Sequence, residues 1–392
     1  MSKEVNRIGI DARFYGPIGK GLGRYTQEIV DNIIKLDLAN EYVIFLRKEN
    51  FNSFSCNNAR VKKVLADIKW YGLAEQIILP FYIWRERLDL IHFPHFNVPV
   101  LCPVKFIVTI HDLILIKYPT QRATTLAPLI YKIKNFFYKI VIALAVKRAR
   151  LVLTVSEYTK KDIIRQFKVD ERKIIVTYEG VADLRETPHP NPLLIKEREH
   201  EEYGLIKQPY LLYVGNAYPH KNLESLIRVY SEICREMKNL SLVLVGKEDY
   251  FYSRLKEQAC LTGRQAKNLG GAVIFPGYVP DDDLKILYSR ARAYVFPSLY
   301  EGFGLPPLEA MAFGLPVVSS NKTCLSEILG EAALYFNPDD EADMKVKIKR
   351  VIKDENLRAD LIKRGYEQVK KYSWSECAEK TLAVYENILK IT

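Results

Sequence analysis

The sequence has few cysteines, and they are not arranged to hold a fold together. Six cysteines are scattered along 392 residues, and no two form a Cys-x-x-Cys pair. This pattern argues against a disulfide framework or a structural zinc site and favours a reducing compartment such as the cytoplasm. The chain also lacks an 18-residue apolar run and a charged-then-apolar leader. We therefore expect neither a membrane-spanning helix nor a signal peptide.

The second half of the chain has no excess of positive charge, although the formal net charge of the whole is +11. Residues 1–190 contain 30 Lys and Arg against 19 Asp and Glu, whereas residues 191–392 contain 28 of each. The asymmetry predicts an acidic partner for the first half, and we expect an anionic membrane surface at the inner face of the cell membrane. A solvated basic surface without a partner is one alternative. A nucleic acid is another, but no nucleic-acid-binding module is recognisable.

Short apolar runs alternate with helical patterns along most of the chain, which predicts parallel sheets covered by helices on both faces. The predicted strands are Arg7–Phe14, Tyr42–Leu46, Asp89–Pro94, Lys105–Asp112, Leu151–Ser156, Lys173–Tyr178, Tyr210–Gly215, Leu240–Gly246, Ala272–Tyr278, Ala293–Ser298, Pro316–Ser320 and Ala332–Phe336. The predicted helices of the first half are Arg24–Leu36, Leu73–Arg87, Thr124–Lys147 and Glu157–Phe167.

The alternation stops in a charged stretch with three prolines, which predicts a linker over residues 186–204. We therefore expect an α/β protein with two doubly wound parallel-sheet domains, residues 1–185 and 205–372. A terminal helix is expected within residues 373–392, and the sequence does not reveal where it docks.

Three notable residues lie at the carboxyl ends of predicted strands: His111, Gly215 and Glu301. Ligands of open parallel sheets bind beyond these ends of the strands. If the two domains face each other with those edges, the active site is the cleft between them.

One stretch, 296-FPSLYEGFGLPPLEAMAFGLPVVSSN-321, places two glutamates eight residues apart around a glycine-rich turn. We expect a helix to begin at Pro306–Pro307, with Glu309 in its first turn. The turn would then present backbone N–H groups at a helix N-terminus, an arrangement that suits a phosphate or a sugar. Two carboxylates that bind hydroxyls on either side of a phosphate indicate a nucleotide-sugar. A tight turn whose glutamates only cap and solvate is the alternative.

This stretch resembles the glutamate–seven residues–glutamate signature of the retaining glycosyltransferases of family 4, which have the GT-B fold. The resemblance covers nearly the whole chain. Its other parts are 8-IGIDARFYGPIGKGLGRY-25, 109-TIHDLI-114, 154-TVSEYTKKDI-163, 213-YVGNAYPHKNLESLI-227 and 276-PGYVPDDDLKILYSRARAYVFPSLYEGFG-304. It implies two Rossmann-like domains that face a central cleft, with the acceptor on the N-terminal domain and the nucleotide-sugar on the C-terminal one.

The resemblance also implies roles for individual residues. Glu301 would bind hydroxyls of the donor sugar, Glu309 the ribose and Lys221 the diphosphate, while His111 would approach the sugar from the N-terminal domain. The catalytic residues would thus be Glu301, His111 and Lys221. Further donor contacts would come from Gly215, Asn216, Tyr278, Val279, Gly302, Phe303, Gly304 and Leu305.

The sequence departs from the family at two positions near Lys221, the lysine that the resemblance places at the diphosphate. Asn216 stands where many relatives carry an arginine, and His220 precedes Lys221 where another arginine is common. Which group assists Lys221 is therefore left open.

The reaction that this resemblance implies is the metal-independent, retaining transfer of a hexose from a nucleotide-diphospho-sugar to a glycan or lipid-linked acceptor, without a cofactor. The motifs most resemble bacterial mannosyltransferases of surface-polysaccharide synthesis, which favours GDP-mannose as donor, with a UDP-sugar second. A sugar-nucleotide epimerase on the same two-domain plan is an alternative. A glycosidase would also use paired carboxylates, but it does not need a phosphate cradle.

The glycines of 16-GPIGKGLGR-24 lie between a predicted strand and a predicted helix, as in a dinucleotide site. Their spacing does not fit Gly-x-Gly-x-x-Gly, and no clear ribose-binding acid follows the next strand. We expect Gly19, Gly21 and Gly23 to belong to a flexible loop that closes over the donor phosphate or the acceptor.

Two features could indicate a metal, but we expect neither to bind one. His92 and His95 have no carboxylate beside them and are expected to be packed or to face the acceptor. The aspartates of Asp281–Asp283 open a predicted helix, Asp281–Ala291, where aspartate is a standard N-terminal cap.

The segment Thr124–Arg150 combines aromatic, apolar and basic residues. It is either a buried helix of the N-terminal domain or a helix that lies on a membrane surface, which the charge asymmetry supports.

Overall fold

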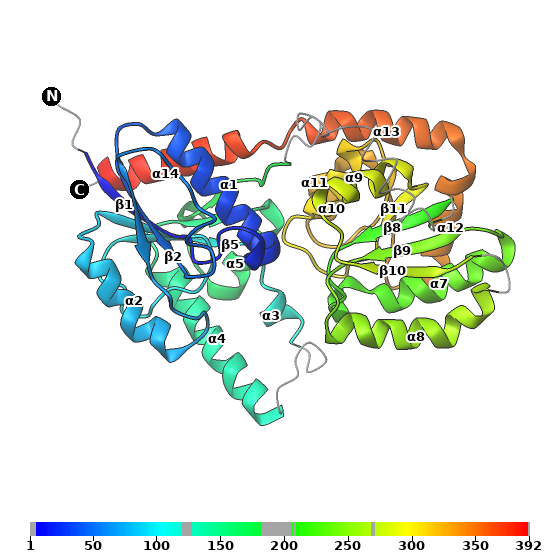
Figure 1. Cartoon of the computed structure of the whole chain (residues 1–392), viewed down its shortest axis with the longest axis horizontal. Coiled ribbons are helices and arrows are strands. Elements are labelled where there is room, and N and C mark those ends of the chain that lie inside the picture. The colour runs from blue at the N-terminus through cyan, green and yellow to red at the C-terminus, as the bar shows by residue number, and fades with distance from the viewer. Residues whose placement is uncertain (1–4, 120–127, 182–205, 207–208, 268–270, 391–392) are drawn as a thin grey trace. The chain divides into compact units, whose positions relative to one another are not determined.

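The computed structural model describes residues 5–119, 128–181, 206, 209–267 and 271–390. The chain folds into two compact units, coloured mainly blue to green and green to orange in Figure 1. Each unit is a parallel sheet covered by helices, which confirms the expected fold class. The predicted linker, residues 186–204, lies outside the described residues.

The first unit is built on a seven-stranded sheet in the order β3-β2-β1-β4-β5-β6-β7. Every neighbouring pair is parallel, and the direction of the strand order reverses between β1 and β4. The strands are β1 (Arg7–Asp11), β2 (Glu41–Leu46), β3 (Val61–Leu65), β4 (Leu90–Phe93), β5 (Phe106–Ile110), β6 (Val152–Thr154) and β7 (Ile174–Val176).

Strand β3 is the one strand of this sheet that the sequence pattern did not predict. It lies at the sheet edge, and most of its side chains, including Lys62 and Lys63, are exposed or half-buried. An edge strand needs no continuous apolar run, and exposed lysines protect its open edge from pairing with another chain. The apolar pattern therefore could not reveal it.

One apolar cluster joins the inner faces of α2, α4 and α5 to the sheet. Helix α5 begins where predicted because Ser156 caps it, its side chain accepting the N–H of Thr159. The helices of this unit are α1 (Lys20–Leu36), α2 (Leu73–Arg85), α3 (Ile114–Lys117), α4 (Pro128–Arg148), α5 (Glu157–Phe167) and α14 (Trp374–Lys390), with 3₁₀ turns at Pro17–Gly19 and Glu171–Lys173.

The terminal helix α14 returns to the first unit and packs against α1 (Figure 1). Its buried residues recur every three or four positions, as one face of a helix requires. The hydroxyl of Tyr385 hydrogen-bonds to His92 Nδ1 at 2.7 Å, and the Trp374 and Tyr25 rings meet at 5.9 Å. Helix α1 is thus the docking partner that the sequence left open.

The second unit has a six-stranded parallel sheet in the order β10-β9-β8-β11-β12-β13. Here the strand order reverses between β8 and β11, so these two strands are neighbours. The strands are β8 (Tyr210–Val214), β9 (Ser241–Val245), β10 (Val273–Gly277), β11 (Ala293–Phe296), β12 (Val317–Ser320) and β13 (Ala333–Phe336).

The helices of the second unit are α7 (Leu223–Glu236), α8 (Tyr250–Lys267), α9 (Asp281–Arg290), α10 (Leu305–Ala312), α11 (Leu325–Leu329), α12 (Glu341–Lys353) and α13 (Glu355–Val369), with 3₁₀ turns at Pro219–Lys221 and Gly330–Ala332. The capping role predicted for Asp281–Asp283 is wrong. Pro280 occupies the N-cap position of α9, and no side chain caps the helix. The three aspartates instead fill its first turn, where the helix dipole favours negative charge.

We expect Tyr385→Phe to weaken the first unit, because the change leaves the buried His92 Nδ1 without its partner. Loss of one buried hydrogen bond costs about 1–3 kcal/mol. The urea midpoint of the first unit should fall, measured by a local fluorescence or hydrogen-exchange probe on α1. Tyr250→Phe, at an exposed tyrosine of the second unit, is the control. An unchanged midpoint for Tyr385→Phe would contradict this account of how α14 docks.

Candidate active site

The central contact of the second unit joins the loops that follow two neighbouring strands. Lys221 lies in the 3₁₀ turn after β8, and Glu301 follows β11. Because β8 and β11 are parallel neighbours, these loops emerge at the same sheet edge. Lys221 Nζ lies 2.5 Å from Glu301 Oε1, with only 13% and 11% of the two side chains exposed. The N–H of Leu299 also donates to the carbonyl of His220 at 2.7 Å, which ties the loops together.

The turn Glu301-Gly302-Phe303-Gly304 leads directly into α10. Gly304 has φ of 102°, a left-handed conformation that favours glycine. Helix α10 begins at Leu305, with Pro306 and Pro307 in its opening positions, one residue earlier than predicted. This start places the backbone of residues 302–305 at a helix N-terminus, as the sequence indicated.

Glu309 does not lie in the first turn of α10, contrary to the prediction, because the helix starts at Leu305 and its first turn contains no acid. Its side chain is buried, and the Tyr288 hydroxyl donates to Oε2 at 3.4 Å. Glu309 thus lies beyond the first turn of α10, so the dipole of that turn is not what stabilises its carboxylate.

The loop after β8 shows what stands in place of the usual arginines. The side-chain oxygen of Asn216, which directly follows Gly215, accepts the N–H of Tyr218 at 3.3 Å, so this asparagine shapes the turn. Burial, followed by the positive charge of Lys221, lowers the pKa of His220 to about 4. His220 is therefore neutral near pH 7, and Lys221 is the cation that this loop supplies.

Two of the expected donor contacts, Tyr278 and Val279, follow β10. The Tyr278 side chain is largely exposed, whereas Val279 is buried. Gly277, just before them, has φ of 80°, which turns the chain sharply at the end of the strand. An exposed aromatic ring beside a buried anchor is compatible with stacking on a base.

His111 follows β5 in the first unit, and both of its ring nitrogens face acceptors. Nδ1 lies 3.1 Å from Glu179 Oε1, and Nε2 lies 2.9 Å from the carbonyl of Pro94. Burial alone would lower the pKa of His111, but the hydrogen bond and charge of Glu179 raise it above the usual value. When both ring nitrogens carry a proton, the ring donates to both acceptors. No sequence motif marks Glu179, which follows β7.

The glycine-rich segment differs from the predicted loop. Helix α1 begins at Lys20, so Gly21 and Gly23 lie in the helix and only Gly19 lies in the preceding 3₁₀ turn. A Cβ on Gly23 would approach the carbonyl of Gly16 to 2.0 Å, whereas Gly21 has open space around it. Gly23 thus permits close packing of the preceding turn, and a flexible loop over residues 16–24 is not what the structure shows.

His92 and His95 are packed side chains. His92 bonds to Tyr385 and, through Nε2, to Thr109 Oγ1 at 2.8 Å, and His95 Nδ1 bonds to Asn97 at 2.5 Å. Burial lowers the pKa of each to about 3, so both are neutral near pH 7. Among the residues that the structure describes, no three His, Cys, Asp or Glu side chains converge as metal ligands.

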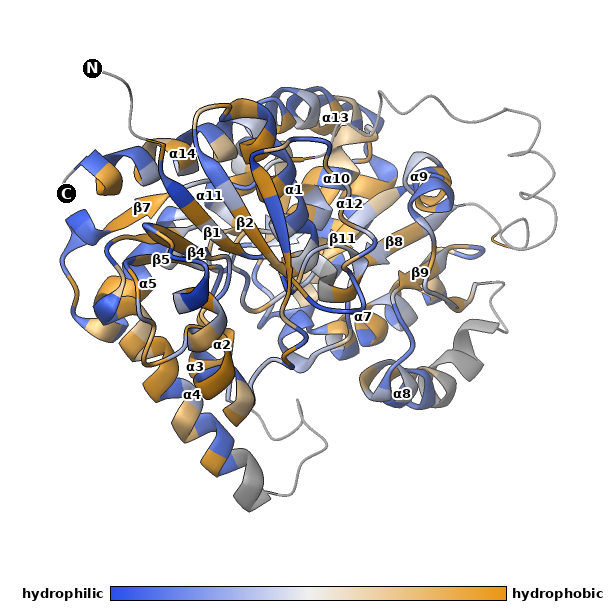
Figure 2. Cartoon of the chain, turned by 60° about the vertical axis from the view of Figure 1, so that its left-hand side comes forward, coloured by the Kyte–Doolittle hydropathy of each residue, from blue (hydrophilic) through white to orange (hydrophobic). Residues whose placement is uncertain are grey.

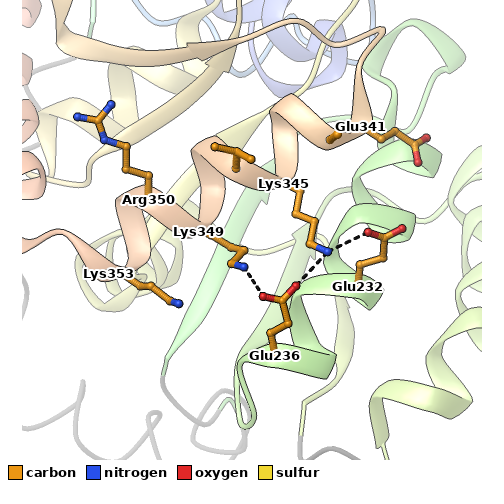
Figure 3. A pocket seen from close by; sticks show the side chains of 9 residues that line it. Glu232, Glu236, Glu341, Lys345, Lys349, Arg350 and Lys353 are labelled. Carbon is orange, nitrogen blue, oxygen red and sulfur yellow. Dashed lines mark hydrogen bonds and ion pairs between the residues drawn. The ribbon is translucent and has the colours of Figure 1, made fainter.

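A groove of about 710 Å³ on the second unit lies between α7 and α12, away from these strand ends (Figure 3). Lys345 bridges Glu232 and Glu236, and Lys349 pairs with Glu236. The groove is thus lined by ion pairs between two surface helices, which contribute little to stability. We do not assign it to the site.

The chain matches two family models that follow one another along the sequence. Residues 20–183 match Glycosyltransferase Family 4, and residues 195–368 match Glycosyl transferases group 1. In a solved structure, sucrose-phosphate synthase from Thermosynechococcus elongatus, the fold is similar with a TM-score of 0.76 at 19% identity, covering 99% of this chain and 100% of that one.

Among curated proteins, O-antigen chain mannosyltransferase B of Escherichia coli is 36% identical over 245 residues, which is 61% of this chain and 61% of that protein. O-antigen chain mannosyltransferase RfbU of Salmonella typhimurium is 31% identical over 302 residues, 77% of this chain and 74% of that protein. Together with the two parallel-sheet units and the two family models, these relatives show that the chain belongs to glycosyltransferase family 4 and has the GT-B fold.

Proposed function

We propose that this chain is a retaining, metal-independent mannosyltransferase that uses GDP-mannose as donor and a glycan or lipid-linked molecule as acceptor. The observation that carries the proposal is the Lys221–Glu301 pair beside the glycine turn, where two neighbouring strands end. The names of the curated relatives favour mannose. A UDP-sugar is the second candidate for the donor.

In this proposal Lys221 and the backbone N–H groups of residues 302–305 stabilise the charge that develops on the departing diphosphate. Hydrogen-bond donors and charges that are held in place before the reaction stabilise the developing charge with little reorganisation. Glu301 binds hydroxyls of the sugar and positions it, while Glu309 binds the ribose. His111 contacts the sugar. The acceptor hydroxyl attacks on the face that the diphosphate leaves, and its proton passes to the departing phosphate.

The proposal predicts release of GDP from GDP-mannose in step with mannosylation of the acceptor, at a rate that persists in EDTA. Radiolabelled donors measure both products. A thermal-shift screen over nucleotide-sugars tests the donor, because a ligand at a hundred times its Kd stabilises by about 2.7 kcal/mol. Donor epimerisation without transfer would support the epimerase alternative. Complete loss in EDTA, restored by manganese, would contradict metal independence.

Substitutions of Glu309 and Glu301 should have different effects on nucleotide binding and on kcat. Glu309→Ala should weaken binding of donor and free GDP alike, roughly 10- to 100-fold, because a hydrogen bond to a charged group contributes about 1.5–3 kcal/mol. Glu301→Ala should spare GDP binding, since Lys221 no longer has a competing carboxylate, and should depress kcat. Calorimetry and steady-state kinetics measure the two effects. Glu331→Ala, at an exposed carboxylate of the same unit, is the control. The reverse pattern would exchange the two roles.

We further propose that the first unit binds an anionic membrane surface through α2 and α4. Both helices contribute to the same apolar cluster, and Figures 1 and 2 place them on the same side of the sheet. Helix α2 exposes an apolar stripe at helical spacing: Leu73, Ile77, Phe81 and Trp84 are 83%, 73%, 56% and 65% exposed. Such an exposed stripe is unusual in a soluble surface and marks an interaction site.

Helix α4 adds exposed aromatic and basic side chains to this surface, including Phe136, Phe137 and Lys139. Neither helix offers an exposed carboxylate: α4 contains none, and Glu75 of α2 is buried and paired with Arg13 at 2.6 Å. Exposed apolar groups and cations without acids suit an anionic lipid surface, where each Lys or Arg contributes about 1 kcal/mol. Among the described residues, no helix is long and apolar enough to cross a bilayer.

The membrane proposal predicts co-sedimentation with vesicles that contain anionic lipid, and loss of binding at 1 M salt, where the Debye length is about 3 Å. The triple change Ile77→Ser, Phe81→Ser and Trp84→Ser should reduce binding several-fold, because it removes the apolar contact. Tyr250→Ser with Val346→Ser, two exposed apolar side chains of the second unit, is the matched control. Binding that does not depend on lipid charge, or that the control weakens equally, would contradict the proposal.

A further inference from the structure

One short segment, Thr323-Cys324-Leu325, contacts three positions of the glycine turn. It follows β12, the strand next to β11, and leads into α11. Thr323 Oγ1 accepts the N–H of Glu301 at 3.1 Å. A Cβ added to Gly304 would come within 2.9 Å of the Leu325 side chain. The segment thus fixes the beginning of the turn by a hydrogen bond and its end by packing.

Cys324 makes the contact that orients two peptide groups. Its fully buried Sγ lies 3.3 Å from the carbonyl oxygen of Glu301 and 3.2 Å from that of Phe303. In a planar trans peptide the carbonyl and the N–H point in opposite directions. Carbonyls that face Cys324 therefore direct the N–H groups of Gly302 and Gly304 away from the thiol. Burial, and then the charge of Glu301, raise the pKa of this thiol well above its usual value, so it keeps the proton it donates.

The backbone of Thr323 is strained in a way that points to a need for its hydroxyl. Its φ is 58°, in the left-handed region that β-branched residues rarely adopt. Residues in such conformations persist only where the surrounding structure over-determines them, and they cluster at active sites and ligand clamps. Glycine would relieve the strain at this position but would leave the Glu301 N–H without its acceptor.

We propose that Thr323 and Cys324 are positioning residues that orient the backbone N–H groups of Gly302 and Gly304 toward the diphosphate of the donor. The inference rests on the proposed function, because it takes the turn as the element that binds the β-phosphate. Neither side chain needs to touch the ligand. The thiol fixes the two peptide planes, and the threonine fixes the backbone at Glu301, whose carboxylate contacts Lys221.

The test compares binding of a nucleoside diphosphate with that of the monophosphate, since only the diphosphate carries the β-phosphate. Calorimetry with GDP and GMP, or with UDP and UMP if the donor is a UDP-sugar, gives the affinity ratio for the full chain. Cys324→Ala and Thr323→Val should reduce diphosphate affinity and kcat at least about tenfold, because small displacements of positioning groups have large effects. Monophosphate affinity should not change. Thr323→Ser keeps the hydroxyl, so its diphosphate affinity and its kcat should both match those of the wild type.

Two further variants separate positioning from stability. Cys234 is a buried cysteine of α7 whose thiol donates to the carbonyl of Leu240 at 3.5 Å. Cys234→Ala removes the same kind of contact elsewhere in the unit and should leave the affinity ratio unchanged. Thr323→Gly relieves the backbone strain, so the melting temperature of this variant should not fall. Its kcat should fall, because the hydroxyl is lost.

Each possible result has a distinct meaning. An unchanged affinity ratio and kcat in Cys324→Ala and Thr323→Val would overturn the positioning role. An equal loss of diphosphate and monophosphate affinity would also overturn it, because the residues would then only support the fold. A wild-type chain that binds neither GDP nor UDP would overturn the proposed function instead.

Discussion

The contact between Lys221 and Glu301 depends on one topological constraint, the adjacency of β8 and β11 in the second sheet. Eighty residues separate the two side chains along the chain, yet the loops after these strands meet because the strand order reverses there. Both charges are nearly buried, and a buried charge without a partner is strongly unfavourable. The pair therefore fixes the relative position of the loops and of the turn that follows Glu301.

The Lys221–Glu301 pair also keeps a cation and a carboxylate side by side in the proposed site before the anionic sugar donor binds. A diphosphate beside Lys221 would take over the partnership that Glu301 provides, and the carboxylate would then be free to accept sugar hydroxyls. His220 cannot share the charge, because burial keeps it neutral near pH 7. The charge balance of the proposed site thus depends on one lysine, and the orientation of the turn amides becomes correspondingly important. That dependence is why the contacts of Cys324 with the turn matter.

Much of the fold could be predicted from the sequence because buried parallel strands are nearly continuous apolar runs. Of the thirteen strands in the described part of the chain, twelve have such runs, whereas edge strand β3 carries exposed Lys62 and Lys63 and has none. Helix starts were less predictable. Helix α10 begins at Leu305 and α1 at Lys20, earlier than the proline and glycine signals indicated. Local signals in the sequence show that a helix begins nearby. Tertiary packing, such as that at Gly23, decides at which residue the helix begins.

The residues that sequence analysis missed act through contacts that no local pattern encodes. Glu179 reaches His111 across 68 residues, and Cys324, after β12, reaches the turn that follows the neighbouring strand β11. The sequence pattern also does not show which apolar side chains of a helix are exposed. In α2, Leu79 and Ile83 pack into the cluster while Ile77 and Trp84, on the same short helix, face solvent. A helix that is apolar on all sides is normally buried or in contact with lipid. Because its own unit covers α2 on only one side, the exposed apolar face of α2 is the feature that the membrane proposal explains.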